Sequence, residues 1–536
     1  MTVTVFASEP WQAIATKKRE EVAAKIPAEW RLPAKYTKDV SETSTASVLH
    51  VPRECGLLSP TELEITENYD AAALVEAIAA AKYTAEEVAV AFCKRAGIAQ
   101  QLSACLTEIF FDEAIAHAKE LDEYFQKTGK TKGPFHGLPI SVKDSFNVKG
   151  YDTTVGFVSF IGRSSATANA PLVDILLDLG AVLYVKTNIP QTMMTADSEN
   201  NIFGRVLNPH NPSLTAGGSS GGAGALVAMR GTLLSVGTDI AGSIRIPALC
   251  CGTFGFKPTA GRIPYGGQLS GARKGSPGIV PCAGPLATTF ADLKLFMDTI
   301  MSANPWDRDP TTLAVPWRDI PAAKEGPLTI GVVGADSVYS FQPPVRRALD
   351  AAVAALKNAG HTVKVLENVP SISEAATLSF KLFSLDPSQS ALKHIEASGE
   401  PPIRSLKSSI PDFGGKAFTI EDVFDFNAQR AEIVAAWHQI WLENGLHAII
   451  MPGHGKTAGP HDTYGHPPYT VVWNLVDWPA CVIPYGRVDP SLDSGDADFD
   501  PNIVQNAPCS IQVIGRRFHD EELLSTASVI AGCLGI

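Results

Sequence analysis

Residues 217–245 read GGSSGGAGALVAMRGTLLSVGTDIAGSIR, and this stretch decides the fold. Its glycine- and serine-rich start, residues 217–222, leads directly into the helix-forming run Ala223–Met229. Because glycine lets backbones approach closely, we expect residues 217–222 to fold tightly onto the N-terminus of that helix. The apolar run Leu233–Gly237 then predicts a buried strand, which leads into a segment rich in small residues, Thr238–Arg245. A loop, a helix and a strand in this order are typical of an α/β protein.

Strands and helices alternate in the same way on both sides of this stretch. Apolar runs predict buried strands over Leu138–Val142, Val182–Val185, Leu328–Val333 and Thr362–Leu366, and helices from Pro171 to Gly180 and over Val345–Asn358. Near-continuous apolar strands that alternate with helices indicate a sheet buried on both faces. We therefore predict one large α/β domain with a mostly parallel, mixed central sheet covered by helices on both faces.

The first sixty residues have a different character. Trp11–Lys25 has helical composition and is followed by proline breakers, and Tyr36–Pro60 is polar and loop-like. A dense alternating pattern begins near Thr61. We predict an N-terminal helical extension over residues 1–60 and a single domain over residues 61–536.

Composition excludes some classes of function. The chain has 536 residues, of which 45% are hydrophobic and 19% charged, as expected for a compact globular protein. Its 44 basic and 56 acidic residues give a net charge of -12, and it contains no basic tract. Binding to nucleic acid or to an anionic membrane surface is therefore not expected. Val206–Met229 lacks charged residues, but its two Asn-Pro pairs and its glycines exclude a membrane span.

The cysteines and the N-terminus indicate the compartment. The chain has nine cysteines and no CxxC pair, so the sequence signals neither a disulfide framework nor a structural zinc site. Met1–Ser8 is too short for the apolar core of a secretory signal. We expect a cytoplasmic protein.

Several familiar motifs do not hold. The chain contains no HExxH motif, Gly222-Ala223-Gly224 lacks the third glycine of a dinucleotide fingerprint at Val227, and the Gly266–Gly271 segment is followed by alanine rather than the lysine of a P-loop. His454, His461 and His466 gather in one glycine- and proline-rich segment, with Asp462 as the only nearby carboxylate. A solvated loop explains that group better than a metal site does, because no cysteine joins the histidines, and we predict no metal and no cofactor.

Residues 217–221 also match GxSxG, the nucleophile elbow of α/β-hydrolases. That motif requires a strand directly before the serine. Residues 205–216 contain two Asn-Pro pairs and cannot form a central strand. The match is therefore set aside.

Ser243 is a stronger candidate for a nucleophile. It lies shortly after the predicted strand Leu233–Gly237, and the small residues before it leave consecutive backbone N–H groups accessible. Acyl transfer needs a nucleophile beside such groups. The alternative is that Ser243 only caps a helix, and the residues alone leave both interpretations open.

Three separated segments decide between them. In order and spacing, Gly137–Asp144 (GLPISVKD), residues 217–222 (GGSSGG) and Gly237–Arg245 (GTDIAGSIR) resemble the amidase signature family. Further segments resemble its fungal acetamidase, or general amidase, branch: Ala91–Arg95, Ile98–Leu102, Val185–Thr187, Pro190–Thr192 and Gln512–Arg517. The similarity runs from about Trp11 to near the C-terminus. It implies the amidase signature fold and an enzyme that hydrolyses carboxamides to acid and ammonia or amine.

The resemblance also implies catalytic roles. Ser243 would be the nucleophile, Lys143 the base, and Ser219 the serine between them, preceded by a cis peptide from Gly218. An ordinary lysine, with a pKa near 10.4, is about 0.04% neutral at pH 7, so Lys143 must be buried to act as a base. The backbone N–H groups of Ile240, Ala241, Gly242 and Ser243 would form the oxyanion hole, and many relatives have glycine in place of Ala241. The expected supporting residues are Gly218, Ser220, Thr238, Asp239 and Arg245.

The substrate is less well defined. By family position Met193, Met194 and Thr195 would face it, with Phe157 and Trp473 as apolar walls. Methionines and aromatic residues suggest a moderately roomy apolar pocket for a small-molecule amide. Carbamates, anilides, esters and fatty acid amides share the same tetrahedral chemistry. A non-catalytic homologue is less favoured, because all three catalytic residues are present. An amidotransferase subunit is less favoured, because the similarity outside the signature segments is to the free-standing amidase branch. The assembly is open, a homodimer being one option.

Overall fold

The computed structural model describes residues 10–276, 278–320, 326–409, 413, 417–494, 496 and 498–536. Its helices are α1 Trp11–Ala24, α2 Val51–Glu54, α3 Pro60–Glu67, α4 Ala71–Ala79, α5 Ala85–Ser103, α6 Phe111–Thr128, α7 Pro171–Asp178, α8 Gly221–Ala228, α9 Arg245–Cys251, α10 Phe290–Ser302, α11 Pro343–Asn358, α12 Ile372–Phe383, α13 Ser390–Ser398, α14 Arg404–Ser409, α15 Ile420–Asn444, α16 Pro468–Leu475 and α17 Asp520–Cys533. Its strands are β1 Leu106–Ile109, β2 Pro139–Lys143, β3 Val182–Thr187, β4 Glu199–Asn200, β5 Gly204–Arg205, β6 Leu234–Asp239, β7 Phe254–Lys257, β8 Cys282–Ala287, β9 Thr329–Val332, β10 Thr362–Val365, β11 Ala448–Met451, β12 Ala480–Arg487 and β13 Pro508–Ile514.

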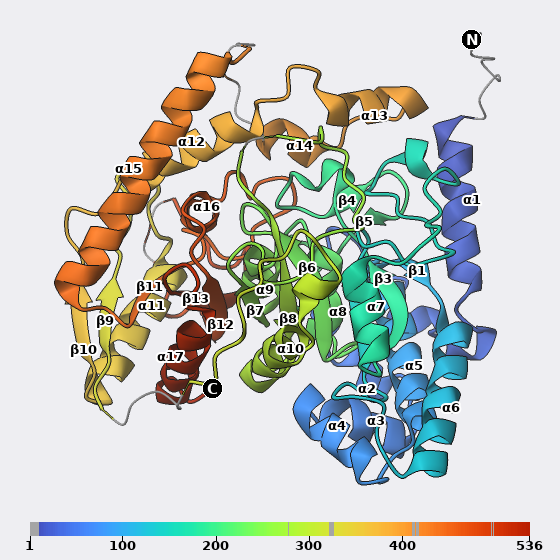
Figure 1. Cartoon of the computed structure of the whole chain (residues 1–536). Coiled ribbons are helices and arrows are strands. Elements are labelled where there is room, and N and C mark those ends of the chain that lie inside the picture. Colours follow the sequence, from blue (N-terminus) through green and yellow to red (C-terminus); the bar gives the residue numbers. More distant parts are fainter. Residues whose placement is uncertain are drawn as a thin grey trace.

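One large mixed sheet runs through the molecule from β1 at one end to β10 at the other (Figure 1). Its strand order is β1-β3-β2-β6-β8-β7-β12-β13-β11-β9-β10. Parallel pairing occurs in two blocks, β3-β2-β6 and β11-β9-β10, where strands alternate with helices along the chain. The joints outside these blocks are antiparallel. The predicted fold class, a single α/β domain around a mixed sheet flanked by helices, is confirmed, and parallel pairing is concentrated in the two blocks.

Helices cover both faces of this sheet. A Cβ on Gly255 of β7 would lie 2.8 Å from the Ala248 side chain of α9. The preceding residue, Phe254, packs against Phe290 of α10, with ring centroids 6.4 Å apart. Successive residues of a strand point to opposite faces, so α9 and α10 lie on opposite sides of the sheet.

The stretch 217–245 folds largely as predicted. Every residue of α8 from Gly221 to Val227 is buried, and its small side chains let neighbouring backbones approach. A Cβ on Gly224, for example, would lie 2.9 Å from the Pro247 carbonyl oxygen of α9. The strand β6 continues two residues beyond the predicted end at Gly237, which places Thr238 and Asp239 inside the sheet. The sheet therefore holds these two residues in place.

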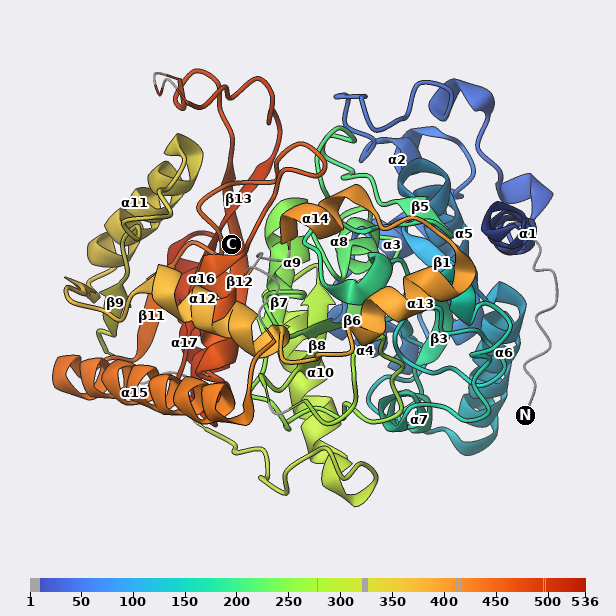
Figure 2. The same cartoon turned by 90° about the horizontal axis from the view of Figure 1, so that it is seen from above.

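The N-terminal region packs against the β1 end of the sheet, where Figure 2 shows α1 in dark blue. The helix predicted over Trp11–Lys25 is present as α1, and residues 1–9 lie outside the described residues. The Nζ atom of Lys18 lies 2.7 Å from a carboxylate oxygen of Glu108 in β1, and both side chains are buried. A domain boundary at residue 60 stays a prediction. Within the part of the chain described here, no helix is both long and apolar enough to cross a bilayer.

Candidate active site

Two parallel strands bring the first candidate residues together. Strand β2 pairs with β6, with Val142 opposite Val236, so both strands end at the same edge of the sheet. Ligand sites in open α/β sheets lie at this edge, beyond the carboxyl ends of the strands. Lys143 is the last residue of β2, and its Nζ atom donates to the Thr238 Oγ1 atom of β6 at 2.8 Å and to the Ser219 Oγ atom at 2.6 Å.

The environment of Lys143 suits a base. Its side chain is 0% exposed. Burial lowers the pKa of Lys143 from its ordinary value to about 7, against the opposing effect of the Asp239 and Asp144 carboxylates. Near neutral pH a large fraction of this amine is therefore unprotonated.

Ser219 lies in a tightly enclosed loop. The Gly218–Ser219 peptide is cis, as the resemblance implied. A Cβ on Gly218 would collide with the Thr195 carbonyl oxygen and would lie 3.0 Å from Cα of Ala196. Glycine is therefore required at position 218, because the neighbouring backbone occupies the space of any side chain.

The turn that carries Ser243 is organised by Asp239. The Asp239 carboxylate accepts hydrogen bonds from the backbone N–H groups of Gly242 at 2.8 Å and Ile244 at 3.1 Å. The Ser243 carbonyl oxygen accepts from the Ser220 N–H at 3.2 Å, which ties this turn to the Ser219 loop. Among the hydrogen bonds of the described residues, none joins the hydroxyls of Ser219 and Ser243 directly.

The backbone amides of this turn differ in their partners. The Gly242 N–H is engaged by Asp239, so we leave Gly242 out of the oxyanion hole predicted from the sequence. The N–H groups of Ile240, Ala241 and Ser243 donate to no other group in the described ranges. Gly242 instead shapes the turn: its φ is +125°, and a Cβ there would collide with the Thr470 side chain.

Arg245 connects the turn to the rest of the fold. Its guanidinium donates twice to Asp239, at 3.1 and 3.0 Å, and both side chains are fully buried. It also donates to the Asn474 Oδ1 atom of α16 at 2.6 Å and to the Gln512 Oε1 atom of β13 at 2.7 Å. The Arg245 guanidinium beside Asp239 keeps the pKa of that carboxyl well below its usual range. Neither Asn474 nor Gln512 was predicted to belong to the site, because both are far away along the chain.

A cavity opens beside Ser243. Its lining comprises Met193, Met194, Thr195, Ala196, Gly218, Ile240, Ala241, Ser243, Ile246, Phe380, Gly465 and Pro467. Met193, Met194 and Thr195 were expected there, whereas Phe380 of α12 and the 465–467 segment were not. The free volume is about 30 Å³. The pocket is thus narrower than predicted.

Phe157 and Trp473 do not line this cavity, which corrects two predictions. Phe157 is fully buried in a separate apolar cluster with Ile395 and packs on His394, with ring centroids 5.3 Å apart. Trp473 is also fully buried, and its ring centroid lies 4.9 Å from that of Trp437. Large aromatic side chains near a site in the sequence are often core residues, and both belong to that class.

The three histidines have separate partners. His454 Nε2 contacts the carbonyl oxygen of His466 at 3.1 Å, and His461 Nε2 contacts that of Pro212 at 2.9 Å. The His466 ring packs on Phe380, with centroids 4.8 Å apart. No cluster of three or more metal-ligating side chains occurs in the ranges that the structure describes.

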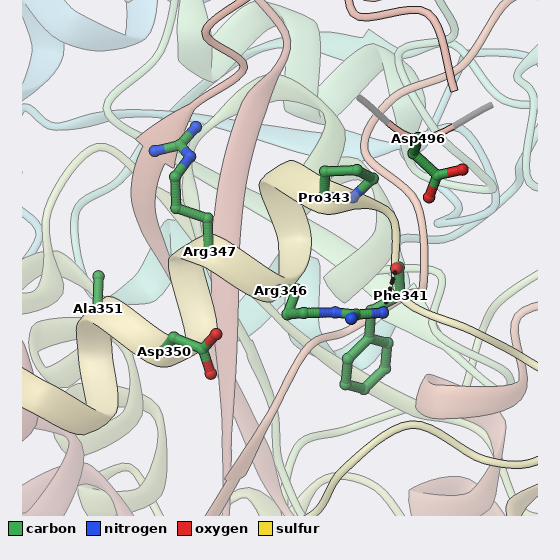
Figure 3. Close-up of a pocket in the computed structure, with 7 residues that line it drawn as sticks. All are labelled: Phe341, Pro343, Arg346, Arg347, Asp350, Ala351 and Asp496. Atoms are coloured by element: carbon green, nitrogen blue, oxygen red, sulfur yellow. Dashed lines mark hydrogen bonds between the residues drawn. The ribbon is translucent and has the colours of Figure 1, made fainter. Parts of the chain in front are cut away.

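A larger hollow of about 500 Å³ lies elsewhere, along the outer side of α11 (Figure 3). Arg346 extends toward Phe341 and donates to its carbonyl oxygen at 3.4 Å, Arg347 extends in another direction, and Asp496 lies across from Pro343. Arg347 is already paired with Asp493, with Nε 2.7 Å from the carboxylate. This hollow contains none of the candidate catalytic residues.

Comparison with known proteins agrees with this geometry. The family model described as Amidase matches residues 87–524. The chain belongs to the amidase family. An amidase of Gibberella moniliformis is 43% identical over 99% of this chain and 100% of its own length, and an acetamidase of Emericella nidulans is 37% identical over 98% and 99%. The chain is therefore similar to fungal amidases over its whole length and is an amide-hydrolysing enzyme.

Solved structures of the amidase family share the fold. A fatty acid amide hydrolase superposes with a TM-score of 0.93 at 32% identity, covering 98% of this chain and 95% of that one. A bacterial aryl acylamidase has a TM-score of 0.71 at 21% identity, over 87% and 96% of the two chains. The second likeness shows the fold alone.

Proposed function

We propose that this amidase cleaves carboxamides to a carboxylic acid and ammonia or an amine through an acyl-enzyme on Ser243. The proposal rests above all on one observation: a fully buried lysine amine, with a pKa of about 7, lies 2.6 Å from the Ser219 hydroxyl oxygen. A buried amine of this kind is a general base, and Ser219 is the group that it can reach.

The first half of the reaction forms the acyl-enzyme. Ser243 Oγ attacks the carbonyl carbon and gives its proton to Ser219, which passes its own proton to Lys143. The carbonyl oxygen becomes an oxyanion, which the N–H groups of Ile240, Ala241 and Ser243 stabilise. The protons then return along the same path to the nitrogen of the substrate, the C–N bond breaks, and ammonia or amine leaves. Because an amide nitrogen leaves only once it is protonated, this return step is essential.

The second half hydrolyses the ester. Water attacks the acyl carbon and gives a proton to the relay, and Ser243 leaves as the hydroxyl. The contact between the Ser219 and Ser243 hydroxyls forms when substrate holds the rotors in place, since catalytic hydrogen bonds often tighten only in the complex. Thr238 stabilises the protonated amine. The Ser220 N–H ties the Ser219 loop to the Ser243 turn, and Asp239 and Arg245 hold that turn in place.

Short acyl groups suit the cavity best. Its free volume of about 30 Å³ is bounded by Met193, Met194 and Phe380, and the acetamidase of Emericella nidulans is 37% identical. Fatty acid amides are the second candidate, because the structural likeness to a fatty acid amide hydrolase extends over nearly the whole chain and methionine side chains adapt readily in shape.

A hydrolysis panel tests these assignments. The purified enzyme is given acetamide, benzamide, an anilide, a long-chain amide, an ester and a carbamate, with Lys143→Ala assayed beside it. We expect acetamide to be hydrolysed and Lys143→Ala to be inactive on every amide. A fluorophosphonate should label the wild type but not Ser243→Ala. Labelling of Ser243→Ala would place the nucleophile elsewhere.

Two further expectations remain predictions. Nine free cysteines agree with a reducing, cytoplasmic setting, and a homodimer is one option for the assembly. Localisation in cells and light scattering of the purified protein test them respectively.

A further inference from the structure

One side of the cavity is a loop, Gln191–Ala196, which we call the wall loop; four of its residues, Met193–Ala196, line the cavity. The segment α13–α14, residues 390–409, lies next to the turn that follows β4, where the Asn201 side-chain amide donates to the Pro401 carbonyl oxygen at 2.7 Å. Between these two helices is Glu400, whose side chain is 4% exposed. No role follows for Glu400 from the catalytic mechanism.

The Glu400 carboxylate joins four segments of the chain. One oxygen accepts from the backbone N–H of Val158 at 2.8 Å and from the Ser398 hydroxyl at 3.1 Å. The other accepts from the side-chain amides of Gln191 and Asn201, each at 2.8 Å. All four donors are neutral, and no basic side chain pairs with Glu400 within the described ranges. Burial raises the pKa of this carboxyl. Since no cation in the described part of the chain compensates for its burial, the four hydrogen bonds are the contacts that hold it in place.

Gln191 passes this constraint to the wall loop. Its Nε2 atom donates to Glu400, and its Oε1 atom accepts from the Ile403 N–H at 3.1 Å, so both ends of the amide are held by the α13–α14 segment. The next two residues, Thr192 and Met193, have φ values of +74° and +60°. Side chains other than glycine rarely adopt this conformation, and it persists only where surrounding contacts impose it.

Apolar packing acts in the same direction. Met193 of the wall loop packs against a small cluster that contains Phe157, Ile395 and Ile403. Two of these residues, Ile395 and Ile403, belong to the α13–α14 segment. The polar contacts of Glu400 and this apolar cluster therefore fix the same loop from the same side.

We propose that Glu400 is a positioning residue that fixes the wall loop and thereby limits the length of the acyl group that the cavity accepts. This rests on the proposed function, which makes the cavity beside Ser243 the substrate site. While the Glu400 contacts are intact, the enzyme prefers amides with short acyl groups. When these contacts are lost, the wall loop can move and longer acyl groups enter the cavity.

The decisive variant is Glu400→Gln. Glutamine has the same shape as glutamate, but its NH₂ group faces N–H or O–H donors where the carboxylate oxygen accepted hydrogen bonds. We expect the ratio of kcat/KM for hexanamide to that for acetamide to rise about tenfold, the size expected for losing one hydrogen bond. The kcat for acetamide should stay within twofold of the wild type. The midpoint of the acidic limb of its pH profile should equal that of the wild type within experimental error. The matched control Glu396→Gln, an exposed position in α13, should change neither quantity.

A reciprocal exchange separates positioning from general destabilisation. In Glu400→Gln/Gln191→Glu the donor and acceptor change places, so the chain-length ratio should return toward the wild type. If Glu400→Gln does not fold, Asn201→Ala removes one donor at a half-buried position and should shift the ratio in the same direction by less. An unchanged ratio overturns the proposal, whether or not the melting temperature falls.

The same comparison can be made without amide turnover. Fluorophosphonates of increasing alkyl length label the nucleophile directly, and Glu400→Gln should accelerate labelling by the longer reagents relative to the shortest. A wild type that is labelled but hydrolyses no amide would refute the proposed function alone. If the labelling rate depends on alkyl length equally in the wild type and in Glu400→Gln, the positioning role of Glu400 alone would be refuted.

Discussion

Replacing Thr238 with valine is expected to move the acidic limb of kcat/KM to lower pH. Thr238 Oγ1 accepts a hydrogen bond of 2.8 Å from the Lys143 amine, and the side chain is only 5% exposed. Valine has the same shape but offers no acceptor, so the charged form of Lys143 loses a partner that water cannot replace. A hydrogen bond to the charged form raises the pKa of an amine, and its removal lowers the pKa.

The size of the shift follows from that contact. A hydrogen bond to a charged group contributes about 1.5–3 kcal/mol, and part of it is retained in the neutral amine. Since about 1.4 kcal/mol corresponds to one pKa unit, we expect a shift of about one unit. The midpoint of the wild type, set by a Lys143 pKa of about 7, should therefore fall to about 6 in Thr238→Val. The plateau rate should fall severalfold, because a weaker base removes the serine proton less readily.

The assay is kcat/KM for acetamide between pH 5 and pH 9, with Thr238→Ser as the control that keeps the hydroxyl. Below the midpoint the wild-type rate should fall about tenfold per pH unit. The serine variant should follow the wild type. A valine profile whose midpoint equals or exceeds that of the wild type would show that another group titrates, and the role of Lys143 as base would be refuted.

Two predictions concern stability. Arg245→Met leaves the fully buried Asp239 without its cation, and the free energy of unfolding in urea should fall by about 3–5 kcal/mol; a loss below 1 kcal/mol would contradict the view that this pair holds the turn. In Lys18→Met the buried Glu108 loses its partner at 2.7 Å. The pKa of Glu108, which burial raises to about 7, then rises further, and a carboxyl with a raised pKa costs the folded state stability as pH increases up to that pKa. The stability gap between wild type and Lys18→Met should thus widen from pH 6 to pH 8, while the exposed control Lys17→Met should show no gap.

The fold class and the parallel pairing were accessible from local patterns, whereas the antiparallel joints were not. Apolar runs separated by helices predicted the strands β2, β3, β6, β9 and β10. Parallel pairing requires a crossover, which a helix between two strands signals in the sequence. The antiparallel joints, such as that between β12 and β13, connect strands separated by a long surface segment, and no local pattern shows that they are neighbours.

In the candidate site, too, some residues could be predicted from local motifs and others could not. Three contiguous motifs contain Lys143, Ser219 and Ser243, and the resemblance of these motifs to the amidase signature implied the three roles. Phe157 and Trp473 were misplaced because an aromatic side chain next to a motif can point to the core or to the cavity, and only packing decides which. Phe380 and Pro467 were missed because they reach the cavity from segments far away along the chain.

The sequence by itself supplied the residues of the proposed proton relay: a lysine that ends a buried strand, and two serines in glycine-rich turns whose backbones only small residues permit. These features are local, since a residue's conformational freedom and its neighbours along the chain are written in adjacent letters. Only the tertiary structure decided the pKa of Lys143, the engagement of the Gly242 amide by Asp239, and the walls of the cavity. Each of these depends on which distant segments exclude water or supply a donor at one point in space, and that is a property of packing rather than of order along the chain.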